Sequence, residues 1–385
     1  MHVLIVTDRF ADLPSPRVAA TVAGSWHRAA PHDVLACLPV SDGGPGFVGA
    51  LAAVLAGRLE AVVATDPLGR EVPASILLVP GGAAGPTAYL EAAQAAGRHL
   101  LAGVERDPTR TTSAGVGRLL LAALDLGARR VVVGVGGLGT NDAGAGLLAA
   151  LGVGSPDTLA RGGAALASLR PEQVEGLDVA RDRFRDVDLV LAADVASPLL
   201  GLKGTSAVFA GRMGATPDQA QGLEAALGHF AGLVARRYPP RTDLLSGEAI
   251  RPERALGAGA GGGVGYALHL LGGRYVAGVE AALDAVGFDR FGAASDLVVT
   301  GCGVFDWESL QGSVPLAVSR RSQRLGVPTV LLAGESVVSR RESMDAGLSG
   351  VYTLTDPTAG APAQTEDRLV RLAARVARTW SPSRP

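Results

Sequence analysis

The sequence predicts an α/β protein that contains a parallel sheet and a second domain with a mixed sheet. Short β-branched runs alternate with Ala- and Leu-rich helical stretches along most of the chain, which is typical of α/β proteins. The runs are continuously apolar, as expected for strands of a parallel sheet that helices cover on both faces. One hairpin interrupts this alternation and indicates that a different module begins there.

The first apolar run stops at Asp8 and lacks the basic region of a signal peptide, so we interpret it as a strand. Similar runs follow at intervals along the chain. The predicted buried strands are His2–Thr7, Val34–Leu38, Arg130–Val135, Asp188–Ala193, Asp296–Thr300 and Pro328–Ala333.

The hairpin is predicted from two runs, Glu60–Thr65 and Glu71–Val79, that flank a tetrapeptide with proline second and glycine fourth. That order is typical of a type I turn and predicts antiparallel pairing. The alternating pattern resumes near Val286. We therefore predict that residues 1–57 and 286–385 form a discontinuous, doubly wound (Rossmann-like) domain, and that residues 58–285 form an inserted α/β domain with a mixed sheet.

Three helices have well-marked starts. Polar residues precede the first two, and glycine follows each of them. Thr216 and Gln219 form a capping box for the third, with proline at its first helical position. The predicted helices are Ala114–Leu126, Ala143–Leu151 and Pro217–Arg237.

The composition excludes several function classes. The 385 residues carry a formal net charge of −2, which argues against an electrostatic nucleic-acid footprint. Cys37 and Cys302 are isolated and the six histidines form no metal-spaced pair, so neither a disulfide framework nor zinc chemistry is expected. The uncharged stretch 255–273 is interrupted by glycines and is not predicted to span a membrane. We expect a soluble, cytoplasmic protein.

Glycine is over-represented, with 53 residues against a usual share of about 7%. In one glycine loop, residues 134–146, a predicted strand leads to Thr140, Asn141 and Asp142 at a helix N-terminus. Unpaired N–H groups and the helix dipole attract phosphate or carboxylate there, so we predict a ligand site; simple helix capping is the alternative. The loop has the Gly-x-Gly-x-x-Gly spacing of a dinucleotide site, but no second strand ending in an acid follows, which disfavours a dehydrogenase.

Asp194 directly follows the predicted strand Asp188–Ala193. Open α/β sheets bind ligands at the carboxyl ends of their strands, and a carboxylate there can act as a general base or as a Mg²⁺ ligand. Capping of the next turn is an equally good interpretation. Lys203, the only lysine, is interpreted as a solvated side chain of the following loop rather than a phosphate contact.

A second glycine loop, residues 257–265, leads into a predicted helix and offers backbone N–H groups to anionic oxygens. It is not a Walker A loop, because no Gly-Lys-Ser/Thr follows. A further strand is predicted to end at Thr300 in a glycine turn, with Asp306 near its tip. Cys302 in this turn is interpreted as a small filler rather than a nucleophile.

Taken in order, these stretches resemble the bacterial type I glycerate kinase family along nearly the whole chain. The most specific likeness is Thr140-Asn141-Asp142 within the glycine run 136–146. The other segments that resemble family motifs are Asp8–Ala11, Ser41–Gly44, Asp107–Pro108, Thr111–Gly117, Asp194–Leu199 and Ala255–Gly265.

The resemblance implies a two-domain kinase that transfers the γ-phosphoryl group of ATP to a hydroxyl of D-glycerate with Mg²⁺. Its expected partner is a small-molecule substrate, glycerate or a related hydroxy acid, and a homodimer is one possible assembly. Asp194 and Asp142 are the implied catalytic residues, and Asp194 and Asp306 the implied metal ligands. The implied substrate contacts are Thr112, Ser113, Thr140, Asn141, Asp8 and Asp42. The implied nucleotide contacts are Gly257, Gly259, Gly261, Gly262, Gly263 and Gly265.

Five positions depart from the family pattern, and each replacement removes a charge. Ala11 and Ser313 stand where a lysine is expected, Pro45 and Cys302 where an acid is expected, and Val304 where an arginine is expected. One arginine at a phosphoryl-transfer site is worth roughly 10³–10⁵ in rate in other systems. The alternative is therefore a weakened or inactive paralogue that binds a small molecule or nucleotide.

Overall fold

The computed structural model describes residues 1–239, 242, 247, 249–354 and 365–381. Contacts divide the chain into two compact units. Unit 1 consists of Met1–Asp42, Gly49–Leu55 and Val279–Pro385, and unit 2 of Gly43–Val48 and Ala56–Gly278. The chain returns to unit 1 a few residues before the predicted position 286, because α11 (Gly278–Ala285) is tied to that unit. Its Glu280 and Asp284 both accept hydrogen bonds from Arg321.

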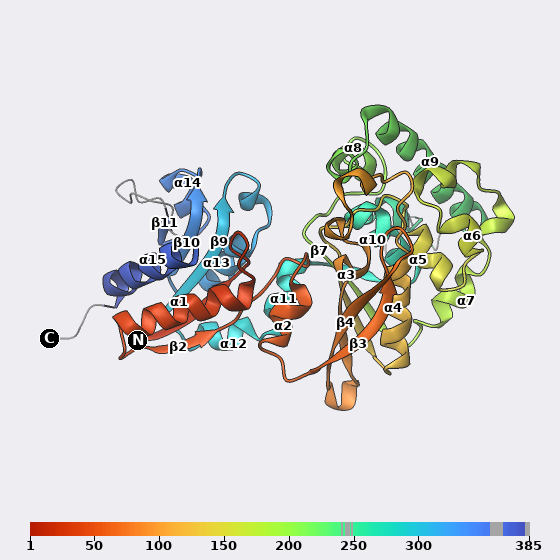
Figure 1. The fold of residues 1–385 in the computed structure, drawn as a ribbon. Helices are drawn as coiled ribbons and strands as arrows, with labels where there is room; N and C mark the ends of the chain where they lie inside the picture. The colour runs from red at the N-terminus through yellow and green to blue at the C-terminus, as the bar shows by residue number, and fades with distance from the viewer. Residues whose placement is uncertain (240–241, 243–246, 248, 355–364, 382–385) are drawn as a thin grey trace. The chain divides into compact units, whose positions relative to one another are not determined.

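Unit 1 contains a five-stranded parallel sheet in the order β11-β10-β9-β1-β2 (Figure 1). The inner strand β1, which lies between β9 and β2, is buried almost throughout, as its continuous apolar run predicts. The strands are β1 (His2–Thr7), β2 (Val34–Cys37), β9 (Leu297–Phe305), β10 (Thr329–Ser336) and β11 (Gly350–Thr353). The prediction that the strand near 296 ends at Thr300 is wrong, because β9 continues to Phe305 and pairs there with Ser336 of β10.

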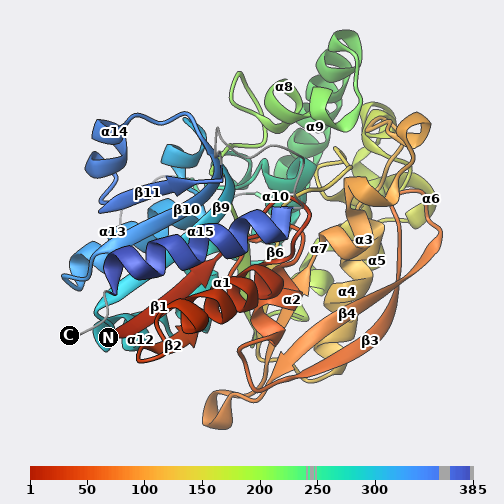
Figure 2. The same ribbon diagram turned by 60° about the vertical axis from the view of Figure 1, so that its left-hand side comes forward.

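Helices cover both faces of this sheet. α1 (Ser15–Ala29) and α15 (Thr365–Trp380) lie side by side on one face, where Ser25 donates a hydrogen bond to the Val370 carbonyl (Figure 2). The β1–β2 and β9–β10 connections run in opposite directions across the sheet, so right-handed crossovers place their helices on opposite faces. The helices of the other face are α13 (Val314–Arg324) and α14 (Arg340–Asp345).

Unit 2 contains a six-stranded mixed sheet in the order β3-β4-β5-β6-β7-β8. The predicted hairpin is confirmed: β3 and β4 pair antiparallel, and Gly69 in their turn has φ +84°. β5 to β8 pair in parallel, so their carboxyl ends lie at one edge. The strands are β3 (Arg58–Thr65), β4 (Glu71–Val79), β5 (Thr87–Glu91), β6 (Arg130–Gly134), β7 (Asp188–Ala193) and β8 (Arg274–Ala277).

The helices of unit 2 follow the predicted capping signals with one correction. Thr216 and Gln219 form the capping box of α9, and Gly127 follows α4 with φ +78°. The predicted helix 143–151 begins only at Ala145, because Ala143 and Gly144 have left-handed backbones that turn the chain first. The main helices are α4 (Ala114–Asp125), α5 (Ala145–Ala150), α9 (Pro217–Arg237) and α10 (Ala260–Leu270), with shorter ones at α3 (Ala93–Ala96), α6 (Pro156–Leu159), α7 (Leu177–Asp182) and α8 (Thr205–Phe209).

The chain passes between the two units four times: after Asp42, within α2 (Phe47–Ala52), after Leu55 and at the start of α11. Within the described part of the chain, no helix combines the length and the apolar character that a bilayer crossing needs.

Candidate functional site

Asp142 is the centre of a buried hydrogen-bond network behind the carboxyl end of β6. Its side chain is fully buried and accepts hydrogen bonds from the Ser113 backbone and hydroxyl at 2.8 and 2.9 Å. The backbone N–H groups of Gly144 and Gly146 donate to it at 3.0 and 3.2 Å. Burial raises the pKa of Asp142, and these donors oppose that rise. The carboxylate thus joins the start of α4 to the start of α5. Its role is to position the backbone of these two segments.

Thr140 and Asn141 are also closed to solvent, each with no exposed surface. The Asn141 amide donates to the Ser206 hydroxyl at 3.1 Å. Three buried side-chain atoms here have no hydrogen-bond partner among the described residues. They are the hydroxyl oxygens of Thr140 and Thr205 and the side-chain amide oxygen of Asn141. Buried polar atoms without partners are rare, and they mark a place where a water or a ligand group would complete the network.

The glycine loop of residues 257–265, which includes the distorted first turn of α10, packs against this signature. Gly261, Gly262 and Gly263 have φ of +59°, +70° and +93°, and a Cβ on Gly262 would lie 1.7 Å from the Thr140 carbonyl oxygen. The backbone N–H groups of Ala258, Gly259 and Ala260 are hydrogen-bonded within the chain. Backbone packing therefore accounts for the glycines, and these three N–H groups are not available to a phosphate. Of the six predicted nucleotide contacts only Gly259 is among these three, so the nucleotide role of this loop stays a prediction.

A Gly262→Ala variant is expected to lose at least about 3 kcal/mol of stability, because a positive φ and a backbone clash act together. Gly272→Ala is the matched control: its φ is +96°, but no atom lies within 4 Å of the new Cβ. We expect the control to cost about 1–2 kcal/mol. The midpoint of urea unfolding measures both, and equal shifts would refute the packing argument.

Asp194 lies at the carboxyl edge of the unit 2 sheet, immediately after β7, and its side chain is exposed. The 43–46 loop packs on the same edge, since a Cβ on Gly43 would lie 2.7 Å from the Ala192 carbonyl oxygen and one on Gly136 would lie 2.7 Å from the Gly44 Cα. Asp194 is thus the one predicted catalytic residue of unit 2 that a solvent-borne ligand can reach directly.

Glu91, at the end of β5, was not predicted from the sequence. It is 7% exposed, and it accepts hydrogen bonds from the backbone N–H groups of Gly46 and Val48, the latter at 3.2 Å. Burial raises its pKa. The carboxylate holds the 43–48 loop at the edge of the sheet. The sequence signal that could have identified Glu91 is an acid at the end of a strand. It was missed because the five-residue strand β5 was not predicted.

Unit 1 contributes two carboxylates that directly follow its strands. Asp8 follows β1, and burial and the nearby Asp42 raise its pKa to about 7. Asp306 follows β9, and the backbone and hydroxyl of Ser309 hold its pKa below the usual range. Burial and the neighbouring Asp8 and Asp306 carboxylates raise the pKa of the Cys302 thiol to about 12. A neutral Cys302 is not an activated nucleophile.

Asp8 and Asp306 are expected to affect stability with opposite pH dependence. The pKa of Asp8 is higher in the folded state, so the stability it contributes is present below its unfolded pKa and is lost as the pH rises towards 7. Asp8→Asn should therefore raise the melting temperature at pH 8 and change it little near pH 4. Asp306→Asn should lower the melting temperature at pH 8, because its folded pKa is depressed. A lower melting temperature of Asp8→Asn at pH 8 would contradict this assignment.

Asp194 and Asp306, the two predicted metal ligands, belong to different units. Among the described residues, no group of three His, Cys, Asp or Glu side chains could together hold a metal ion. Mg²⁺ is commonly bound by one or two carboxylates together with substrate phosphates, so a single accessible carboxylate is compatible with it.

The five replaced positions have ordinary structural surroundings. Ala11 adopts a left-handed turn with φ +51°, and the Ser313 hydroxyl donates to the Ser309 carbonyl. Val304 is 52% exposed, whereas Cys302 is buried within β9. Pro45 lies against Gly137. Among these residues, none supplies a charge in place of the one that the family pattern expects.

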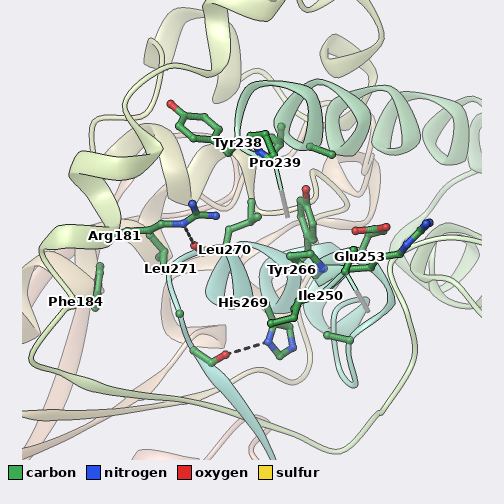
Figure 3. Close-up of a pocket in the computed structure, with 18 of the residues that line it drawn as sticks. Arg181, Phe184, Tyr238, Pro239, Ile250, Glu253, Tyr266, His269, Leu270 and Leu271 are labelled. Carbon is green, nitrogen blue, oxygen red and sulfur yellow. Dashed lines mark hydrogen bonds between the residues drawn. The ribbon is translucent and has the colours of Figure 1, made fainter. Parts of the chain in front are cut away.

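A cavity of about 870 Å³ lies elsewhere in unit 2 (Figure 3). Val187 and Gly273 line it and directly precede β7 and β8, so it lies beside the amino ends of these strands, whereas Asp194 follows the carboxyl end of β7. Tyr238 and Tyr266 form part of its wall, and Arg181 there donates to the Leu270 carbonyl. No predicted site residue is among the described residues that line it.

The fold and this arrangement define a two-unit α/β protein with a candidate site at the carboxyl edge of a mixed sheet, supported by a buried Thr-Asn-Asp signature. A model of the glycerate kinase family matches residues 3–381. The chain therefore belongs to the glycerate kinase family, and this membership supports its assignment as a kinase.

Individual relatives agree with this assignment. Glycerate kinase of Bacillus subtilis is 35% identical over 360 residues, covering 92% of this chain and 90% of its own. Glycerate kinase of Haemophilus influenzae is 34% identical over 387 residues and 98% of each chain. The crystal structure described as glycerate kinase 2 from Salmonella typhimurium LT2 matches with a TM-score of 0.79 at 33% identity, covering 98% of this chain and 96% of that one.

Proposed function

We propose that this chain transfers the γ-phosphoryl group of ATP to a hydroxyl of D-glycerate, or of a closely related hydroxy acid, in the presence of Mg²⁺. Family membership supports the reaction class. The observation that carries the proposal is the exposed Asp194 carboxylate at the carboxyl end of β7, where α/β sheets bind ligands.

Asp194 acts on the acceptor hydroxyl in this proposal. A carboxylate within hydrogen-bond distance orients the hydroxyl and accepts its proton as the oxygen attacks phosphorus. Bound Mg²⁺ would neutralise charge on the transferring phosphoryl group, and holding this ion is the alternative role of Asp194. Asp142 and Glu91 do not take part directly; they hold the backbone on either side of the site.

No residue is assigned to ATP. The loop predicted to hold it uses the N–H groups of Ala258, Gly259 and Ala260 for its own hydrogen bonds. The other predicted nucleotide contacts of this loop stay predictions.

The test is formation of phosphoglycerate by purified protein from D-glycerate, ATP and Mg²⁺, followed by mass spectrometry. Product that requires all three components supports the proposal. Absence of product at high enzyme concentration, with the protein shown to be folded by its circular dichroism, rejects it.

A second candidate function is a weakened or inactive paralogue that binds a small molecule or nucleotide. The observation that favours it is the loss of charge in unit 1, where Cys302 stays neutral and Val304 and Ala11 carry no charge. Glycerate binding without product, measured by calorimetry, would select this function over catalysis.

A further inference from the structure

A groove of about 450 Å³ beside α15 gathers five arginines within unit 1. No aspartate or glutamate is among the described residues that line it, although the whole chain has a net charge of −2. None of the predicted site residues lines it either. The arginines are Arg28 from the end of α1 and Arg368, Arg371, Arg375 and Arg378 from α15.

The sequence of α15 separates these arginines from its apolar face. Leu369, Leu372 and Val376 are buried against the sheet, whereas Arg371 and Arg375 are exposed one helical turn apart. Like charges at this spacing repel one another and destabilise a helix. Residues 368–378 hold four arginines and no acid, so this part of the helix presents charge of one sign, which favours binding of an anion.

α15 carries two acids in its first turn, Glu366 and Asp367, and no ion pair joins either of them to the groove arginines among the described residues. Glu366 accepts hydrogen bonds from Arg17 and Thr21 of α1, each at 2.8 Å. Arg368 is held at the rim, where it donates to the Leu354 carbonyl at 2.9 Å. Within the described parts of the chain, Arg28, Arg371, Arg375 and Arg378 form no ion pair or hydrogen bond through their guanidinium groups. Four guanidinium groups therefore remain open to an external anion.

We propose that this groove binds a small oligophosphate, an anion in which several phosphate groups are linked in a chain. Guanidinium groups match phosphate oxygens in bidentate geometry, and a chain of phosphates can engage successive arginines along the helix. A single-stranded nucleic acid is a poorer fit, because no aromatic side chain among the described lining residues could stack a base.

The experiment is isothermal titration calorimetry of sodium tripolyphosphate into the whole protein, at about 50 mM salt and without Mg²⁺. We expect binding to the unmodified protein and at least a tenfold weaker affinity for the Arg371→Glu/Arg375→Glu variant. The matched control is Arg320→Glu/Arg324→Glu on α13, which makes the same charge change at the same spacing on the opposite face of the sheet. The control should bind as tightly as the unmodified protein.

Several outcomes would overturn the proposal. Equal loss of affinity in both variants would show general charge attraction, and unchanged affinity in the groove variant would place the anion elsewhere, including at the kinase site. Absence of binding, or tighter binding of a single-stranded RNA of equal charge, would also reject it. If the glutamate variant fails to fold, Arg371→Gln/Arg375→Gln replaces it, with the melting temperature as a check of folding. Because the groove is lined by α1, α15 and the end of β11, and by none of the predicted site residues, the result is independent of whether the chain phosphorylates glycerate.

Discussion

An Asp194→Asn variant is expected to lose kinase activity by about 10³-fold while its melting temperature stays within about 1 °C of that of the unmodified protein. The amide keeps the size of the side chain but cannot accept the hydroxyl proton, and proton transfer by a positioned group contributes about 10²–10⁴ in rate. Stability should be unaffected because the side chain is exposed, and exposed substitutions rarely change stability by more than about 0.5 kcal/mol.

The matched control for Asp194 lies at the other end of the same strand. Asp188 begins β7 and is paired with Arg274 at 3.0 Å. Asp188→Asn should keep full activity and cost at most about 1 kcal/mol, as expected for a surface ion pair. If both variants keep the rate of the unmodified protein, Asp194 is not the catalytic carboxylate. If both lose it, the effect comes from β7 as a whole.

The second large effect is expected for Asp142→Ala, which should lower the free energy of unfolding by about 4 kcal/mol or more. The change leaves the buried N–H groups of Ser113, Gly144 and Gly146 without an acceptor, and each such group costs about 1–3 kcal/mol. Asp142→Asn should lower the free energy of unfolding by an intermediate amount. Its amide oxygen still accepts hydrogen bonds, but its NH₂ group is a donor and faces backbone N–H groups that are donors too.

Asp157→Ala provides the control for this loss. Asp157 is exposed in the first turn of α6, so its removal should cost no more than about 1 kcal/mol. Urea unfolding followed by circular dichroism measures all three variants. A small loss for Asp142→Ala would mean that water replaces the carboxylate, and the network would then not be needed to position the site.

The sequence predicted eight of the eleven described strands and missed three short ones, β5, β8 and β11. β5 is buried, but it has only five residues and polar residues at both ends. β1, β6 and β7 are nearly continuous apolar runs because their neighbours enclose them. β8 and β11 have four residues each and are only partly buried at the edges of their sheets, so their sequences carry no such run.

The glycine-rich loop shows a different limit of prediction from sequence. A glycine needed for a ligand and a glycine needed for another backbone look alike in sequence, because both positions exclude a Cβ. At Gly262 the neighbour is the Thr140 carbonyl of the chain itself. Likewise, a Thr-Asn-Asp signature at a helix start is compatible with ligand contact or with burial, and only the structure shows that these side chains are closed to solvent. Their predicted substrate contacts stay predictions.

The order of segments in unit 1 has a consequence for synthesis on the ribosome. β1 pairs with β9, whose first residue is Leu297, so β1 must wait for most of the chain to be made before this neighbour is available. At 5–20 residues per second, that delay is roughly 15–60 s. Unit 2 is almost wholly one continuous segment and can complete its sheet in the meantime. The nascent N-terminal segment, with the apolar β1, is then the part of this protein that most needs chaperone protection.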